Sequence, residues 1–94
     1  KRTFRVRLHF AEPDNVEAGS RVFDVKIQNR TVLSNLDIVS ESGRQNGAVS
    51  REISQLSTSG ELVIEFVPKT PTSLPVLSGL ELVDDSWQPP KKER

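Results

Sequence analysis

The chain has 94 residues, enough for one small domain, and its 13 basic and 13 acidic side chains cancel to a formal net charge of zero. This balance argues against nucleic acid or an anionic membrane as a partner, because both select a one-sided basic surface. With no cysteine and no apolar run near the roughly 20 residues of a membrane span, neither a disulfide, a thiolate metal site nor membrane insertion is expected.

The first predicted strand covers residues 3–10 and alternates without a break, so no signal peptide is expected ahead of it in these residues. Its apolar side chains share one face of the pleated backbone: Phe4, Val6, Leu8 and Phe10. A second strand, residues 22–28, repeats the pattern with Phe23, Val25 and Ile27 on its inward face. The two rows of phenylalanine and aliphatic side chains are predicted to form a common core.

A polar loop over residues 12–20 separates these two strands. Pro13 lacks the amide proton that continued pairing needs, and Gly19 relieves backbone sterics, so the chain is expected to leave the sheet here. A loop of this length on a rigid two-stranded base is typical of a binding loop.

The middle of the chain predicts shorter elements. Asn29 and Arg30 have the spacing of a tight hairpin turn, with asparagine tolerating the left-handed conformation. Residues 36–43 indicate a short helical turn that Asp37 caps and Gly43 ends. Residues 48–53 are polar enough to be either an edge strand or an irregular stretch.

Two further strands are predicted, over residues 61–67 and 76–83. Leu62, Ile64 and Phe66 share one face of the former, and Leu80 and Leu82 share one face of the latter. Between them a stiff crossing is bracketed by prolines that cannot pair as a central strand: Pro68, Pro71 and Pro75. Residues 84–94 read as a polar tail or linker in which Trp87 is the one tryptophan. Five or six short strands with almost no helical periodicity predict an all-β, antiparallel β-sandwich over residues 1–83.

Several separated blocks together resemble the malectin domain family: residues 8–12 (LHFAE), 21–25 (RVFDV), 31–33 (TVL), 36–38 (LDI) and 62–67 (LVIEFV). The resemblance implies part of a malectin-like or galactose-binding-like jelly roll, corresponding to the C-terminal half of the family domain. It implies a non-catalytic, lectin-like module that binds di- or oligosaccharides in an extracytoplasmic setting, or in the endoplasmic reticulum lumen of a eukaryote. The Pro- and Glu-rich first loop looks more like the bacterial members.

The resemblance also suggests where a sugar would bind. Glycan-reading animal members carry an aromatic pair after the Phe-Ala-Glu block, and the matching positions here are Asp14 and Asn15. They also use an acidic residue before the last strand, where this chain has Ser73 and Leu74. Polar loops would then hydrogen-bond sugar hydroxyls, and the predicted ligand-binding residues are Glu12, Asp14, Asn15 and Ser73.

Other chemistry is less well supported by the sequence. Glu12, Asp14 and Glu17 are potential calcium ligands, but their spacing matches no defined calcium loop. Glu12 and Asp24 as a glycosidase pair would need a raised pKa and a substrate cleft, and nothing near His9 completes a nucleophile arrangement. No catalytic residue, metal or cofactor is therefore predicted.

A second class of function remains open. The phenylalanines all fall on predicted core faces, which leaves Trp87 as the ring free to stack on a sugar. The alternative is a structural or protein-protein interaction sandwich that has lost sugar binding. Half a sandwich would expose apolar faces and strand edges, so we expect a compact variant, self-association, or cover from the remainder of a larger parent protein.

Overall fold

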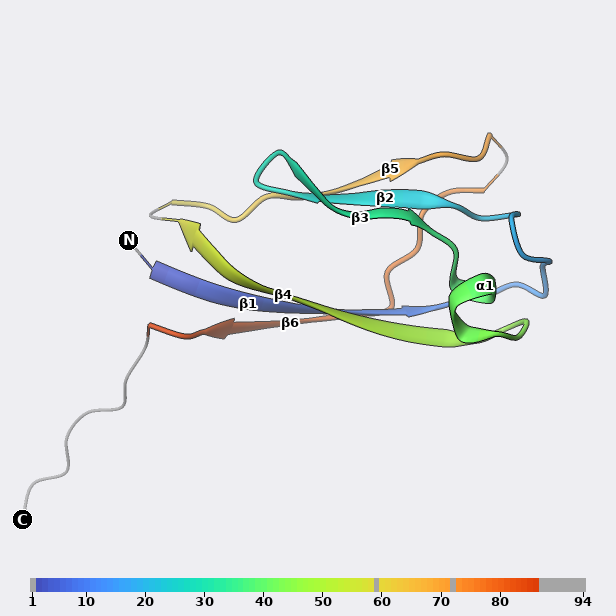
Figure 1. Cartoon of the computed structure of the whole chain (residues 1–94), viewed down its shortest axis with the longest axis horizontal. Coiled ribbons are helices and arrows are strands. Elements are labelled where there is room, and N and C mark those ends of the chain that lie inside the picture. Colours follow the sequence, from blue (N-terminus) through green and yellow to red (C-terminus); the bar gives the residue numbers. More distant parts are fainter. Residues whose placement is uncertain (1, 59, 72, 87–94) are drawn as a thin grey trace, which may run out of the picture.

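The computed structural model describes residues 2–58, 60–71 and 73–86, so the expectation for Trp87 and most of the polar tail lies outside the described residues. Its elements are β1 (Arg2–Ala11), β2 (Phe23–Ile27), β3 (Arg30–Leu36), α1 (Ile38–Ser42), β4 (Ala48–Thr58), β5 (Ile64–Pro68) and β6 (Gly79–Asp84). The strands form two antiparallel three-stranded sheets, ordered β4-β1-β6 and β3-β2-β5, which stack as two layers (Figure 1). The predicted antiparallel sandwich is confirmed.

The core forms between the two central strands, as the alternation predicts. The fully buried side chains of β1 and β2 are Val6, Leu8, Phe10, Phe23, Val25 and Ile27. The ring centroids of Phe10 and Phe23 lie 5.7 Å apart across the layers, and those of Phe23 and Phe66 lie 6.4 Å apart. Tilted and edge contacts of this kind add to the free energy gained by burying the rings.

The prediction that the first loop rests on a two-stranded base made of β1 and β2 is wrong in one respect. β1 pairs with β4 and β6, and β2 pairs with β3 and β5, so β1 and β2 face each other without pairing. Both edges of β1, and both edges of β2, are paired with strands of their own sheet. The loop over residues 12–20 consequently crosses from one sheet to the other.

The predicted hairpin is present, but its turn lies one residue earlier than expected. Gln28 and Asn29 adopt φ values of 51° and 64°, and Arg30 is already the first residue of β3. Two successive positive φ values match the right-handed twist of the flanking strands, which favours this turn. The Gln28 amide also accepts from Val63 N at 2.8 Å and donates to Glu61 O at 3.2 Å, holding the approach to β5.

The short helix has the predicted caps. The Asp37 carboxylate accepts from Ser40 N at 3.3 Å, and Gly43 closes α1 with φ of 79° while its N–H donates to Val39 O at 2.9 Å. The same aspartate accepts from Gly19 N at 2.6 Å. Asp37 therefore joins the helix start to the first loop.

Three strand boundaries differ from the prediction. β4 is the predicted edge strand, but it continues to Thr58 instead of ending at Ile53, with a register shift opposite Phe4 and Val6. β5 starts at Ile64 instead of residue 61, and β6 starts at Gly79 instead of residue 76. Residues 69–71 and 73–78 lie outside strands, between β5 in one sheet and β6 in the other (Figure 1).

The outer face of the β4-β1-β6 sheet is a ladder of opposite charges. The His9 ring bonds Ser50 Oγ through Nδ1 at 2.7 Å and Glu81 Oε2 through Nε2 at 2.6 Å. Arg7 lies 3.7 Å from Glu81 and 3.0 Å from Glu52. His9 thus lies on a strand surface within hydrogen-bond distance of a hydroxyl and a carboxylate, two partners from β4 and β6 that the sequence did not show to be near it.

Because of this ladder, the free energy of unfolding is expected to depend on pH. The hydrogen bond from His9, followed by the charge of Arg7, lowers the pKa of Glu81 below its ordinary 4.5. A carboxyl whose pKa is lower in the folded chain stabilises the fold above its unfolded pKa and loses that contribution as pH falls through the folded pKa. We expect the difference in unfolding free energy between wild type and Glu81→Gln to shrink as urea melts are repeated from neutral pH into acid. A difference that stays constant across this range would contradict the pairing.

Candidate functional site

The inward rows of β1 and β2 continue into the first loop with charged side chains. Glu12 lies two residues after Phe10, and Arg21 lies two residues before Phe23, so both have the parity that points between the sheets. Glu12 is 3% exposed and Arg21 is 8% exposed. A buried acid and a buried base therefore face each other where the loop begins and ends.

The two side chains form a forked ion pair. Arg21 Nε lies 3.0 Å from Glu12 Oε1, and Arg21 Nη2 lies 3.1 Å from Glu12 Oε2. Paired hydrogen bonds of this geometry fix orientation as well as charge. The hydrogen bond that Arg21 donates to Glu12 raises the pKa of Arg21 above its ordinary value, against the opposing effect of burial. The pair closes this end of the core.

Arg21 also connects two loops that are far apart in the sequence. Its Nη2 donates to Asp14 Oδ2 at 2.8 Å in the first loop, and its Nη1 donates to the backbone oxygen of Leu74 at 2.5 Å in the crossing. The Asp14 amide donates to Glu12 Oε2 at 3.1 Å. One guanidinium thus holds the first loop (residues 12–20) and the crossing (residues 69–71 and 73–78) together, and we call these two segments the loop rim.

The loop rim lies at one end of the sandwich, beside α1 (Figure 1). Additional bonds hold the outer part of the first loop: Glu17 accepts from the Gln45 amide at 2.9 Å, and Glu12 N donates to Gly47 O at 2.9 Å. The crossing is anchored by Lys69 N, which donates to Val22 O at 2.8 Å. Both segments are therefore tied to the body at several points.

The predicted ligand-binding residues fall into two groups. Asp14, whose side chain is 64% exposed, and Asn15 lie on the accessible surface of the loop rim, and Ser73 is half-buried in the crossing beside Leu74. Glu12 is buried with both carboxylate oxygens bonded to Arg21. Asp14 and the Ser73-Leu74 segment, 59 residues apart at their nearest (73 − 14), come together at this guanidinium.

Sequence reasoning missed Arg21. The signal was present, because an acid at the inward parity of one strand and a base at the inward parity of the next mark a buried pair across the layers. The predicted inward rows ended at Phe10 and began at Phe23, so Glu12 and Arg21 were not counted as inward residues.

The loop rim has no aromatic ring among the residues that the structure describes. Phe10 and Phe23 are buried, Phe66 packs against the core from β5, and Phe4 lies near the far end of β1. Contact with a sugar here would rest on hydrogen bonds and on the exposed aliphatic side chain of Leu74.

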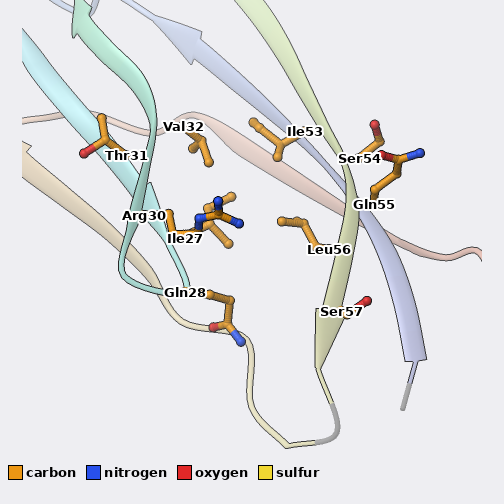
Figure 2. A pocket seen from close by; sticks show the side chains of 10 residues that line it. All are labelled: Ile27, Gln28, Arg30, Thr31, Val32, Ile53, Ser54, Gln55, Leu56 and Ser57. Atoms are coloured by element: carbon orange, nitrogen blue, oxygen red, sulfur yellow. The ribbon is translucent and has the colours of Figure 1, made fainter.

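A separate cavity of about 470 Å³ opens at the opposite end of the sandwich, between the β2-β3 turn and β4 (Figure 2). Its walls carry the apolar side chains of Ile27, Val32, Ile53 and Leu56, and Arg30 is the charged residue of its lining. None of the predicted ligand-binding residues lines it. The cavity and the loop rim are therefore distinct sites.

The considered metal and glycosidase arrangements do not assemble. Within residues 2–58, 60–71 and 73–86, no group of three or more His, Cys, Asp or Glu side chains is placed to hold a metal ion. Asp24 lies on the outward side of β2, where it accepts from Asn35 N at 2.8 Å and lies 3.6 Å from Lys69, whereas Glu12 points inward. No helix in this described part has the length and apolar character to cross a membrane.

A model of the malectin domain matches residues 1–79. The chain belongs to the malectin domain family. The match covers both segments of the loop rim and ends at the first residue of β6. The resemblance deduced from the separated sequence blocks is thus confirmed, and with it the carbohydrate-binding-like fold of malectin domains.

Two relatives of this malectin domain are plant proteins. It is 36% identical over 70 residues to "Receptor-like protein 4" of Arabidopsis thaliana, a match covering 72% of this chain and 11% of that protein. The crystal structure of the plant receptor-like kinase FER superposes with a TM-score of 0.68 and 19% identity over 89% of this chain and 25% of that one, which shows the shared fold. The expected likeness of the first loop to bacterial members finds no support in these matches.

Proposed function

We propose that this malectin domain is a non-catalytic module that recognises a di- or oligosaccharide at the loop rim. The sandwich over residues 1–83 would be the binding unit, with residues 84–94 as a polar tail, in an extracytoplasmic setting or the endoplasmic reticulum lumen. Asp14, Asn15 and Ser73 would contact the sugar, whereas Glu12 would act through Arg21 by fixing the loop. The observation that carries the proposal is the guanidinium that bonds both segments of the rim.

The chemistry of the rim suits hydroxyl groups. A carboxylate oxygen of Asp14 accepts from a hydroxyl, the Asn15 amide both donates and accepts, and the Ser73 hydroxyl does the same. Because Arg21 holds these segments in place before a ligand arrives, little ordering is required on binding. Without ring stacking we expect weak affinity, with a Kd on the order of 1 mM.

An NMR titration tests this proposal. The 94-residue chain would be titrated with maltose- and cellobiose-series oligosaccharides, and the amides of residues 14–16, 73 and 74 are expected to shift together. Asn15→Ala is expected to weaken binding about fivefold, the loss of one hydrogen bond. Lys26→Ala, on the outer face of the β3-β2-β5 sheet, is the matched control and should leave Kd unchanged.

Two results would count against the proposal. One is the absence of shifts with any of these oligosaccharides at any soluble concentration. The other is shifts confined to the cavity beside Arg30, which would move saccharide recognition to the opposite end of the sandwich.

A structural or protein-protein interaction module is the second candidate. The exposed aliphatic side chains favour it, because Val63, Leu74, Leu77 and Val83 lie on the surface while no ring of the described residues does so at the rim. A pull-down in which Leu74→Ser abolishes capture of a protein, while sugars neither bind nor compete, would support this reading.

A further inference from the structure

Two leucines of β6 point toward the interior of the sandwich but are not covered. Leu80 is in register with Leu8, and Leu82 is in register with Val6. Directly paired residues lie on the same side of a sheet, so Leu80 and Leu82 face the same layer as the fully buried Leu8 and Val6. They are nevertheless 46% and 51% exposed, because β6 is an edge strand.

Among the residues that the structure describes, no strand pairs with the outer edge of β6, which is open for hydrogen bonding. Asp85 N donates to Thr3 O at 2.8 Å, and hydrogen-bonded pairs alternate along an antiparallel ladder whose register has no shift from Asp84 back to Gly79. By this alternation Glu81 and Val83 direct their backbone groups to β1, and those of Leu80 and Leu82 point outward. The exposed leucines thus coincide with the unpaired backbone groups.

Native edge strands are protected by proline, lysine or inward-pointing charge, and β6 lacks the first two. Its charged residue at the centre, Glu81, points outward and bonds His9 and Arg7. Asp84, at the end of the strand, is the charge on the side of the leucines, and it is paired with Arg2. The net charge of the chain is zero, so two copies do not repel each other at long range. These features favour pairing of the edge with an identical strand.

We propose that two copies of this chain associate through β6, antiparallel about a two-fold axis at Glu81. The β4-β1-β6 sheets then join into one continuous sheet. Leu80 lies opposite Leu82 of the partner subunit, which gathers four leucines on the inward side, and the outward backbone groups of both strands form hydrogen bonds. On the other side Val83 lies opposite Gly79 of the partner subunit, where no side chain obstructs it.

This register is preferred over the neighbouring one. An axis at Leu82 also matches the backbone groups, but it places the Asp84 carboxylate against Leu80 on the apolar side. The axis at Glu81 brings two carboxylates together on the solvent side, where each already lies 3.7 Å from Arg7 and 2.6 Å from His9 of its own copy. In this register Asp84 lies opposite Ser78 of the partner subunit, at the end of the paired strands, and the leucines oppose only each other.

Cysteine cross-linking tests the register, because the natural chain has no cysteine. Opposed residues of a non-hydrogen-bonded antiparallel pair have Cα atoms about 4.5 Å apart, within the range that a disulfide spans. Glu81→Cys is expected to cross-link under mild oxidation. Val83→Cys is not, because the two copies of residue 83 lie about 13 Å apart, four strand steps. Glu65→Cys, on the outer face of β5, is the second control.

Sedimentation equilibrium measures dimer formation in a chain without an introduced cysteine. Wild type is expected to show a concentration-dependent monomer-dimer equilibrium, and Leu82→Lys should weaken it at least about tenfold because the dimer would bury two ammonium groups. Val63→Lys, at an exposed apolar position away from β6, should leave it unchanged. The proposal is overturned if wild type sediments as a monomer at all soluble concentrations, if Leu82→Lys dimerises as wild type does, or if Glu65→Cys cross-links as well as Glu81→Cys.

Discussion

Replacing Arg21 with methionine is expected to lower the free energy of unfolding by about 3 to 5 kcal/mol, measured by urea denaturation at neutral pH. The substitution keeps most of the apolar stem but leaves the buried Glu12 carboxylate without its partner. It also frees the backbone oxygen of Leu74 and the carboxylate of Asp14. Most of the lost stability comes from the buried Glu12 carboxylate that has no partner.

Two controls separate the buried charge from general damage. The double variant Glu12→Gln, Arg21→Met is expected to recover a large share of the loss, since no buried charge remains. Arg51→Met breaks the exposed pair with Glu41 and should cost less than about 1 kcal/mol. A loss below about 1 kcal/mol for Arg21→Met would show that the pair does not hold this end of the core.

The second large effect is expected at the aromatic centre of the core. Phe23→Ala should destabilise the chain by about 3 to 5 kcal/mol, because Phe23 is fully buried between Phe10 and Phe66 and its removal leaves a cavity. Leu74→Ala, at an exposed position, should change stability by no more than about 0.5 kcal/mol. Losses below about 1 kcal/mol at both Phe10→Ala and Phe23→Ala in thermal and urea melts would mean that these faces are not the core.

Features set by local chemistry were predictable from the sequence. The inward rows of β1 and β2 follow from strict alternation, since a pleated strand has only two faces. The caps of α1 follow from Asp37 and Gly43, because a carboxylate satisfies free amide donors and glycine accepts positive φ. Such features depend on a few neighbouring residues.

Features set by packing between distant segments were not predictable. The division of the strands into two sheets, with β1 and β2 facing each other, depends on pairings of β4, β5 and β6 that leave no local signature. The register shift opposite Phe4 has the same origin. Leu80 and Leu82 were correctly assigned to one face, but their exposure reflects what the opposite sheet fails to cover.

The candidate site divides in the same way. Asp14, Asn15 and Ser73 came from the malectin resemblance, and their use in binding stays a prediction. The convergence of both segments on Arg21 required the fold, because Asp14 and Leu74 are brought together only by the layered arrangement. The parity of Glu12 and Arg21 would have predicted the pair itself.

Amide hydrogen exchange in an Arg21→Lys variant tests most directly whether one side chain holds the loop rim together. Lysine retains the charge that Glu12 needs but lacks the fork that reaches Asp14 and Leu74. We predict faster exchange at the amide of Asp14 and at those of Lys69 and Ser78 in the crossing, with Val25 in the core unchanged. Faster exchange in the first loop alone, with the crossing at its wild-type rate, would contradict a shared anchor.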